Sequence, residues 1–248
     1  MSAVVQSEAA DALVRVDEVD SATHITLNRP DKMNALSADL VERLIRAVDD
    51  AHARRSDLIV FRGEGRNFSA GFDFGGYEDQ SEGDLVLRFV RIETLLQKIA
   101  ASPALTLALA HGKNFGAGVD LFGACMLRVA TEQSSFRMPG LKFGLVLGTR
   151  RFAAQVGGQV ARDVLTNTRT FSAEDGQAIG FVSGIAETEG WDACIADAAR
   201  SARELSPATR ATLYGVLAPA CADADMAGLV RSAAEPGIKQ RIEAYLKK

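Results

Sequence analysis

The sequence predicts an α/β fold, and three observations carry this prediction. Two apolar runs, Leu58–Phe61 and Leu105–Ala110, indicate core strands, and the first is typical of a strand that is buried on both faces. Each run leads into a glycine-centred turn, at Asn67–Asp73 and at His111–Asp120. Amphipathic helical stretches separate the strands, and strands that alternate with helices are typical of α/β proteins.

Composition sets the class of protein. The chain has 248 residues, of which 47% are hydrophobic and 24% charged, and this is ordinary globular usage. A net charge of -4 gives no basic surface for nucleic acid. The three cysteines lack CxxC or Cys/His spacing, so we expect reduced thiols in a cytoplasmic protein without a metal site.

Targeting and membrane segments are not expected. Glu8, Asp11 and Arg15 stand where a secretory leader needs an apolar core. The uncharged run from Ile99 to Gly112 is interrupted by Pro103 and is shorter than the roughly 18 residues of a membrane span.

The N-terminal third begins with two alternating segments, Leu13–Val19 and Thr23–Leu27, which predict a hairpin of half-buried strands. Ser37 then has the character of an N-cap before an apolar stripe at helical spacing, which ends near Arg54. The strand at Leu58–Phe61 follows, and the first glycine turn comes directly after it.

The next segments repeat the order of strand, turn and helix. An amphipathic stretch from Leu85 to Ile99 predicts a second long helix, closed by Pro103 before the strand at 105–110. The run Met126–Ala130 is a weaker strand candidate. From Gly190 onward the pattern becomes almost purely helical, which predicts an α/β core over residues 1–189 and a helical region over 190–248.

The two glycine turns are small enough to bring backbone N–H groups close to a ligand. Donors at two such turns, directed at one point, would stabilise negative charge on a carbonyl oxygen, which is the geometry of an oxyanion hole. The other interpretation of each turn is purely structural.

Four segments in order resemble the crotonase superfamily, the enoyl-CoA hydratase/isomerase family, and the resemblance runs from about Leu13 to the C-terminus. Arg29 to Leu36 is similar to the Pro-x-x-x-Asn-Ala-Leu segment of the family, and Phe68 to Asp73 to its first oxyanion-hole loop. The segment His111 to Leu121 resembles the second loop with its helix, and Thr170 to Val182 the late Ala-x-x-x-Gly-Leu-Val signature.

This resemblance implies a crotonase-like spiral of ββα units, with residues 190–248 as a helical C-terminal trimerisation region. It implies an acyl-CoA substrate, no separate cofactor, and a homotrimer or a dimer of trimers. The implied oxyanion donors are the N–H groups of Phe72 and Ala117, and Asp120 takes the position of the first catalytic glutamate. The residues implied to contact the CoA portion are Lys32, Ser69, Ala70, Asp73 and Gly116.

Asp120 has two interpretations. A carboxyl group near a helix N-terminus and an apolar acyl pocket can act as a general acid or base. Alternatively, Asp120 caps its helix or pairs with Arg128.

The sequence departs from the family where its second catalytic glutamate follows a proline, since Pro139 is followed here by Gly140. Gly148, where some relatives carry an aspartate, supplies no substitute. Arg150 and Arg151 are interpreted either as ligands of a substrate carboxylate or as solvated or intersubunit residues. Hydration, isomerisation, thioester hydrolysis, decarboxylation, carbon–carbon cleavage and silent acyl-CoA binding all stay open.

Two further expectations concern the acyl pocket. The segment around Tyr77 is a candidate lid, because glycines and charges surround it. The pocket shape is expected to depend on large side chains, namely Phe74, Leu87, Phe115, Met138 and Phe143.

Overall fold

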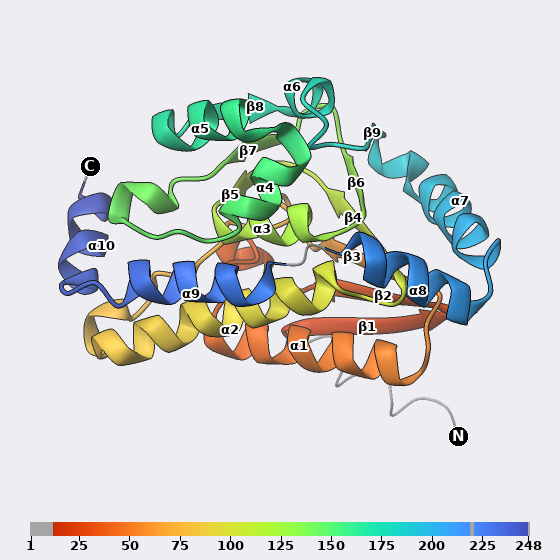
Figure 1. The fold of residues 1–248 in the computed structure, drawn as a ribbon, viewed down its shortest axis with the longest axis horizontal. Coiled ribbons are helices and arrows are strands. Elements are labelled where there is room, and N and C mark those ends of the chain that lie inside the picture. Colours follow the sequence, from red (N-terminus) through yellow and green to blue (C-terminus); the bar gives the residue numbers. More distant parts are fainter. Residues whose placement is uncertain (1–11, 219–220, 248) are drawn as a thin grey trace.

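The computed structural model describes residues 12–218 and 221–247. Glu8, Asp11 and Lys248 lie outside the described residues. In these residues the chain forms an α/β spiral with a main sheet, a small second sheet and ten α-helices (Figure 1). The predicted α/β class and crotonase-like arrangement are confirmed.

The main sheet has six strands in the order β1-β2-β3-β4-β6-β9. The first pair is antiparallel, as predicted for the N-terminal hairpin, and all later neighbours are parallel. The strands are β1 (Val14–Val19), β2 (Ala22–Leu27), β3 (Leu58–Gly63), β4 (Leu105–Ala110), β6 (Leu127–Ala130) and β9 (Gly184–Ile185).

The second sheet consists of three short strands in the order β5-β7-β8, with bounds Lys113–Phe115, Ser135–Arg137 and Thr170–Ser172. It holds the end of the second glycine turn, because β5 leads into the helix α3 (Ala117–Ala124). Strands of three residues are too short for a periodic signal, and the sequence did not predict them.

Two layers of helices cover the main sheet. One layer contains α1 (Ala38–Ala53), α2 (Glu82–Ala100) and α9 (Ala222–Ala233), which pack against one another (Figure 1). The opposite face is covered by α7 (Trp191–Arg203), which packs on β3 and β4. Side chains from β3 and β4 therefore enter two separate apolar clusters, as expected of strands buried on both faces.

The predicted start of α1 is observed, and α2 (Glu82–Ala100) begins three residues before the predicted stretch. The Ser37 hydroxyl accepts a hydrogen bond from the N–H of Leu40 and caps α1, while Ser81 and Asp84 form a capping box at α2. The remaining helices are α4 (Thr149–Val156), α5 (Gly158–Asn167), α6 (Ala173–Ala178), α8 (Pro207–Leu217) and α10 (Ile238–Leu246). Short 3-10 segments occur at Pro30–Lys32, Tyr77–Asp79, Gly140–Phe143 and Thr188–Gly190.

The helical region after residue 190 packs on the core of its own chain. Leu229, Ala233, Ile238 and Ile242 are buried in the same apolar cluster as the residues of α1 and α2. Among the described residues, no single helix is long and apolar enough to cross a membrane; α8 and α9, which meet at a bend of 49°, reach that length and composition only together.

Candidate active site

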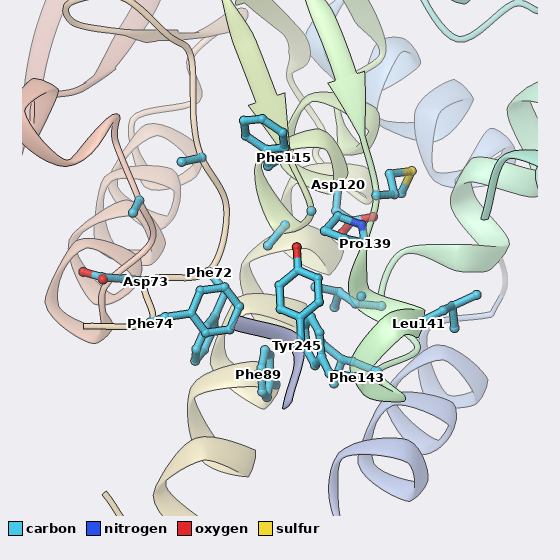
Figure 2. Close-up of a pocket in the computed structure, with 18 of the residues that line it drawn as sticks. Phe72, Asp73, Phe74, Phe89, Phe115, Asp120, Pro139, Leu141, Phe143 and Tyr245 are labelled. Atoms are coloured by element: carbon cyan, nitrogen blue, oxygen red, sulfur yellow. The ribbon is translucent and has the colours of Figure 1, made fainter. Parts of the chain in front are cut away.

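A cavity of about 510 Å³ lies between the two glycine turns, the 140–143 segment and the C-terminal helix. Its wall is largely apolar and includes a cluster of aromatic rings (Figure 2). The rings of Phe72 and Phe89 stack with centroids 4.3 Å apart, and Phe74, Phe143 and Tyr245 continue this cluster. Such a surface favours an apolar ligand group.

The two glycine turns meet at the cavity. The N–H of Phe115 donates to the carbonyl of Ser69 at 3.2 Å, and a Cβ built on Gly71 would stand 3.0 Å from the nitrogen of Ala117 while overlapping the carbonyl of Phe115. Gly71 has φ +79°, which also favours glycine. A side chain at position 71 would therefore separate the turns.

Polar side chains hold the first turn in place. Asn34 donates to the carbonyls of Glu64 and Asn67, each at 2.9 Å, and the fully buried Ser69 hydroxyl donates to the carbonyl of Asn34 at 2.9 Å. Ser69 also accepts from the N–H of Gly71 at 3.2 Å. The Pro-x-x-x-Asn segment thus builds the turn rather than the cavity wall.

Phe72 and Ala117 both line the cavity, and their backbone N–H groups have no acceptor among the described residues. Ala117 is the first residue of α3, where N–H groups have no partner within the helix. The preceding Gly116 has φ +46° and ψ -121°, a conformation that suits glycine.

Asp120 lies one turn into α3 and also lines the cavity, with 7% of its surface exposed. No hydrogen bond or ion pair to its carboxyl group is found in the described part of the chain. Burial raises the pKa of Asp120 well above the ordinary range of an aspartate, the positive charge of Arg151 opposes this rise, and Glu93 adds to it. A carboxyl group with a raised pKa can exchange a proton near neutral pH.

Asp120 is not paired with Arg128, which was, beside a helix cap, one of the two structural roles expected for it. Arg128 donates instead to the carbonyls of Cys125, Met126 and Phe181. Arg128 therefore ties β6 to the end of α6, away from the Asp120 carboxyl group.

The rim of the cavity carries an ion pair. Asp73 accepts from Arg29 at 2.5 Å and from the N–H of Gly75 at 2.8 Å. Partial burial raises the pKa of Asp73, but these two donors outweigh it, and the pKa is lowered. Arg88 donates to the carbonyl of Asp73 at 2.6 Å and lies 4.2 Å from the centre of the Phe72 ring. The loop that carries Phe72 is thus held from both sides.

Comparisons with known proteins agree with this arrangement. The sequence model described as enoyl-CoA hydratase/isomerase matches residues 17–232. The chain belongs to the enoyl-CoA hydratase/isomerase family. A crystal structure of a Bordetella parapertussis protein assigned to the enoyl-CoA hydratase/isomerases is 58% identical, with a TM-score of 0.94 over 95% of this chain and 99% of that one.

Curated relatives of this family member are more distant. An assigned enoyl-CoA hydratase of Bacillus subtilis is 32% identical over 203 residues, which is 78% of this chain and 77% of the relative. A second, from Mycobacterium tuberculosis, is 31% identical over 190 residues, or 74% of this chain and 76% of the relative. The enoyl-CoA hydratase of Bacillus halodurans, at 22% identity and a TM-score of 0.83, shares the fold.

In this family member most of the residues expected at the site lie together. Lys32, Ala70, Phe72, Asp73, Gly116, Ala117 and Asp120 all line the cavity. Ser69 does not, because its side chain is fully buried in the turn. No group of three or more His, Cys, Asp or Glu side chains in residues 12–218 and 221–247 is placed to hold a metal ion.

Two expectations about neighbouring residues, those for Leu87 and Arg151, were wrong. Leu87 is 57% exposed on α2 and lies outside the cavity wall. Tyr77 is buried in the main apolar cluster, and the lid role expected for its segment stays a prediction. Arg151 is neither solvated nor free for a substrate carboxylate, since it is buried and paired with Glu93 and Asp225 of the same chain.

The sequence analysis missed several contributors to the cavity, among them Phe89 of α2 and two residues of the C-terminal helix. Tyr245 and Leu246 come from α10, more than 120 residues after Asp120, and line the same space. Figure 2 shows the Tyr245 hydroxyl projecting beyond the phenylalanine rings, on the side where Asp120 and Pro139 lie. The amphipathic pattern of residues 238–246 predicts a helix but gives no information about the surface on which it docks.

Proposed function

We propose that this protein is an enzyme that forms an enolate from an acyl-CoA thioester. The N–H groups of Phe72 and Ala117 hold the thioester oxygen, and Asp120 accepts the proton from the α-carbon. The observation that carries this proposal is the junction of the two turns, which brings two unpaired N–H groups and one buried carboxyl group to a single aromatic cavity.

The step is balanced within the site. The α-carbon to hydrogen bond breaks, its proton moves to a carboxylate oxygen of Asp120, and the electron pair shifts onto the thioester oxygen. Return of the proton to the α-carbon regenerates the substrate and appears only as exchange. In a 3-enoyl-CoA the enolate is conjugated with the double bond, so return of the proton to the γ-carbon moves the double bond. One carboxyl group suffices for this sequence, and Gly140 supplies no second one.

The rim of the cavity supports binding of the CoA portion. Lys32 is exposed there, and Ala70, Asp73 and Gly116 lie beside it on the cavity wall. Lys32 is suited to a phosphate group, because its ammonium group is free to move in solvent.

The charges of the wall favour an uncharged acyl group. Lys32, at the exposed rim, is the one cation among the described residues that line the cavity. The carboxylate of a malonyl-type thioester would therefore be buried without a counter-charge, which costs several kcal/mol. We expect a neutral, apolar acyl group, and this disfavours the decarboxylase alternative.

The test is exchange of the α-protons of butyryl-CoA in D₂O, followed by proton NMR, because exchange reports an enolate whatever the net reaction is. We expect exchange by the wild-type protein and a loss of about 10²-fold or more in Asp120→Asn, with butyryl-CoA binding retained by calorimetry. Exchange that is equal in both proteins would overturn the role of Asp120.

Net reactions are then compared on crotonyl-CoA, a 3-enoyl-CoA and malonyl-CoA. Isomerisation of the 3-enoyl-CoA with slow hydration of crotonyl-CoA agrees with a single carboxyl group. Rapid hydration of crotonyl-CoA would contradict it, and binding without exchange or turnover would identify a silent acyl-CoA-binding protein.

A further inference from the structure

A buried ion cluster lies behind Asp120. Arg151 of α4 is 6% exposed and donates to both carboxyl oxygens of Glu93, at 3.0 and 2.5 Å. Glu93, on α2, is 1% exposed. Arg151 also donates to Asp225 of α9 at 3.2 Å, and the exposed Arg150 pairs with Asp225 at 3.0 Å. This cluster joins three helices.

The cluster reaches the catalytic candidate through a small void. Asp120, Gly148 and Arg151 line a space of about 10 Å³, together with the apolar side chains of Met138, Phe152 and Phe181. The Nε–H group of Arg151 is buried and has no acceptor among the described residues. Arg151 therefore keeps one donor that Glu93 and Asp225 do not use.

The backbone brings Asp120 close to this charge. A Cβ built on Gly148 would overlap the Asp120 carboxyl group, so the carboxyl group lies directly against Gly148. Gly148 is the N-cap of α4, and the positive end of a helix favours a carboxylate. Arg151 is the third residue of that helix.

We propose that Arg151 is a positioning residue for Asp120. Its buried positive charge, beside the void at Gly148, allows Asp120 to lose its proton in an apolar cavity, and Glu93 limits the size of this effect. The use of that proton in catalysis rests on the proposed function, but the electrostatic coupling of Asp120 to Arg151 and Glu93 does not.

The charged groups on the helices packed near Asp120 act on it in opposite directions. Arg151 of α4 attracts the carboxylate and Glu93 of α2 repels it, while Asp225 pairs with both Arg151 and Arg150. Tyr245 of α10 faces the same cavity with its hydroxyl group. A purely structural role of the ion cluster would change stability without changing the titration of Asp120, so the two roles can be separated.

The experiment measures the unfolding free energy of the wild-type protein and of Asp120→Asn across pH 4 to 9. Folding raises the pKa of Asp120. The contribution of its carboxyl group to the unfolding free energy is therefore fully present below about pH 4, the pKa of an aspartate in the unfolded chain, and is lost as the pH rises through the folded pKa. The pH at which the difference between the two proteins becomes constant gives the folded pKa without any activity assay.

The same comparison is then made with Arg151→Met and with Glu93→Gln. We expect Arg151→Met to raise the folded pKa of Asp120 by about one unit or more, and Glu93→Gln to lower it. Shifts of opposite sign are the result that a general loosening of the fold cannot produce. If exchange of α-protons is also measured, the pH at which it begins should rise in Arg151→Met and fall in Glu93→Gln.

The matched control is Arg210→Met. Arg210 is 3% exposed, donates to Asp57 at 2.7 Å, and belongs to a different part of the fold, on α8. We expect Arg210→Met to lose stability as Arg151→Met does, but to leave the folded pKa of Asp120 unchanged. If Arg151→Met fails to fold, the double variant Arg151→Met/Glu93→Gln, which removes both buried charges, replaces it.

An unchanged Asp120 titration in both Arg151→Met and Glu93→Gln, or shifts of the same sign, would overturn the proposal. These outcomes are independent of enolate formation. If the two variants show the opposite shifts but the wild-type protein exchanges no α-protons, the coupling is retained and the proposed function is lost.

Discussion

At the scale of single residues, Gly148 explains how an aspartate fits where the family has a glutamate. From the sequence, Gly148 is only a position without a carboxyl group. In the structure it makes room for one, because the Asp120 carboxyl group fills the space that a side chain at 148 would need. The short side chain of Asp120 and the absence of a side chain at Gly148 therefore belong to one arrangement.

This arrangement predicts the effect of Gly148→Ala. Gly148 has φ +61°, which costs alanine about 1–2 kcal/mol, and the added Cβ also displaces Asp120. Gly76→Ala is the matched control, since Gly76 has φ +68° and open space around its Cβ position. Urea unfolding should show Gly148→Ala to be at least about 1 kcal/mol less stable than Gly76→Ala. Equal losses would mean that the contact with Asp120 carries no energy.

Gly140 is a residue at which the chemistry can be changed. Gly140 lines the cavity. The atom nearest to a Cβ built there is the carbonyl oxygen of Leu145, at 3.2 Å. We expect Gly140→Glu to fold and to raise hydration of crotonyl-CoA by about 10²-fold, the lower end of general acid–base catalysis. Gly140→Gln, which has the same shape but no acidic proton, should stay at the wild-type rate. If hydration of crotonyl-CoA rises equally in both variants, the gain comes from the shape of the pocket and not from an acidic proton.

At this scale the sequence predicted the site residues that lie within a recognisable motif. It missed the contacts that arise when distant segments pack together. Phe72, Ala117 and Asp120 belong to two recognisable turns and lie together as expected. The partners of Arg151 are 58 and 74 residues away, on helices whose relative position no local pattern gives. Ser69 belongs to a motif but faces inward, because its hydroxyl group is needed to close the turn.

At the scale of elements, long periodic segments were predicted well and short ones were not. The helix α1 has a continuous apolar stripe with a capping serine, and both its ends agree with the sequence prediction. The strands β5, β7 and β8 have three residues each, and neighbouring segments rather than their own sequence hold them in a sheet.

The helix α10 closes the cavity and offers a test at this scale. Ile242 is fully buried and anchors the helix, while Arg241 donates to the carbonyls of Phe143 and Glu235 at 3.1 and 2.9 Å. We expect Ile242→Ala to cost about 2–5 kcal/mol and to weaken binding of butyryl-CoA more than binding of CoA, because Tyr245 and Leu246 lose their position. Leu44→Ala, which truncates an equally buried residue of α1, should lose stability without this selective loss of binding.

At the scale of the whole molecule, the C-terminal helices serve their own chain and leave one apolar face uncovered. Helices α7, α9 and α10 bury side chains in the core, whereas Leu213, Val216 and Leu217 of α8 are 42%, 78% and 70% exposed. Their spacing of three and four residues places them on one side of that helix. The proposed trimer or dimer of trimers would cover such a face with a second copy of the chain.

This assignment predicts the outcome of a charge placed on that face. Sedimentation of the wild-type protein should give three or six times the 26.4 kDa mass of one chain, and Val216→Glu should shift the population toward smaller species, because a carboxylate would be buried unpaired at the contact. Val19→Glu, at a position 54% exposed on β1, is the control that adds the same charge elsewhere and should leave the assembly intact. A wild-type protein that sediments as a single chain, or a Val216→Glu variant with unchanged mass, would remove α8 from the contact and leave the apolar face unexplained by self-association.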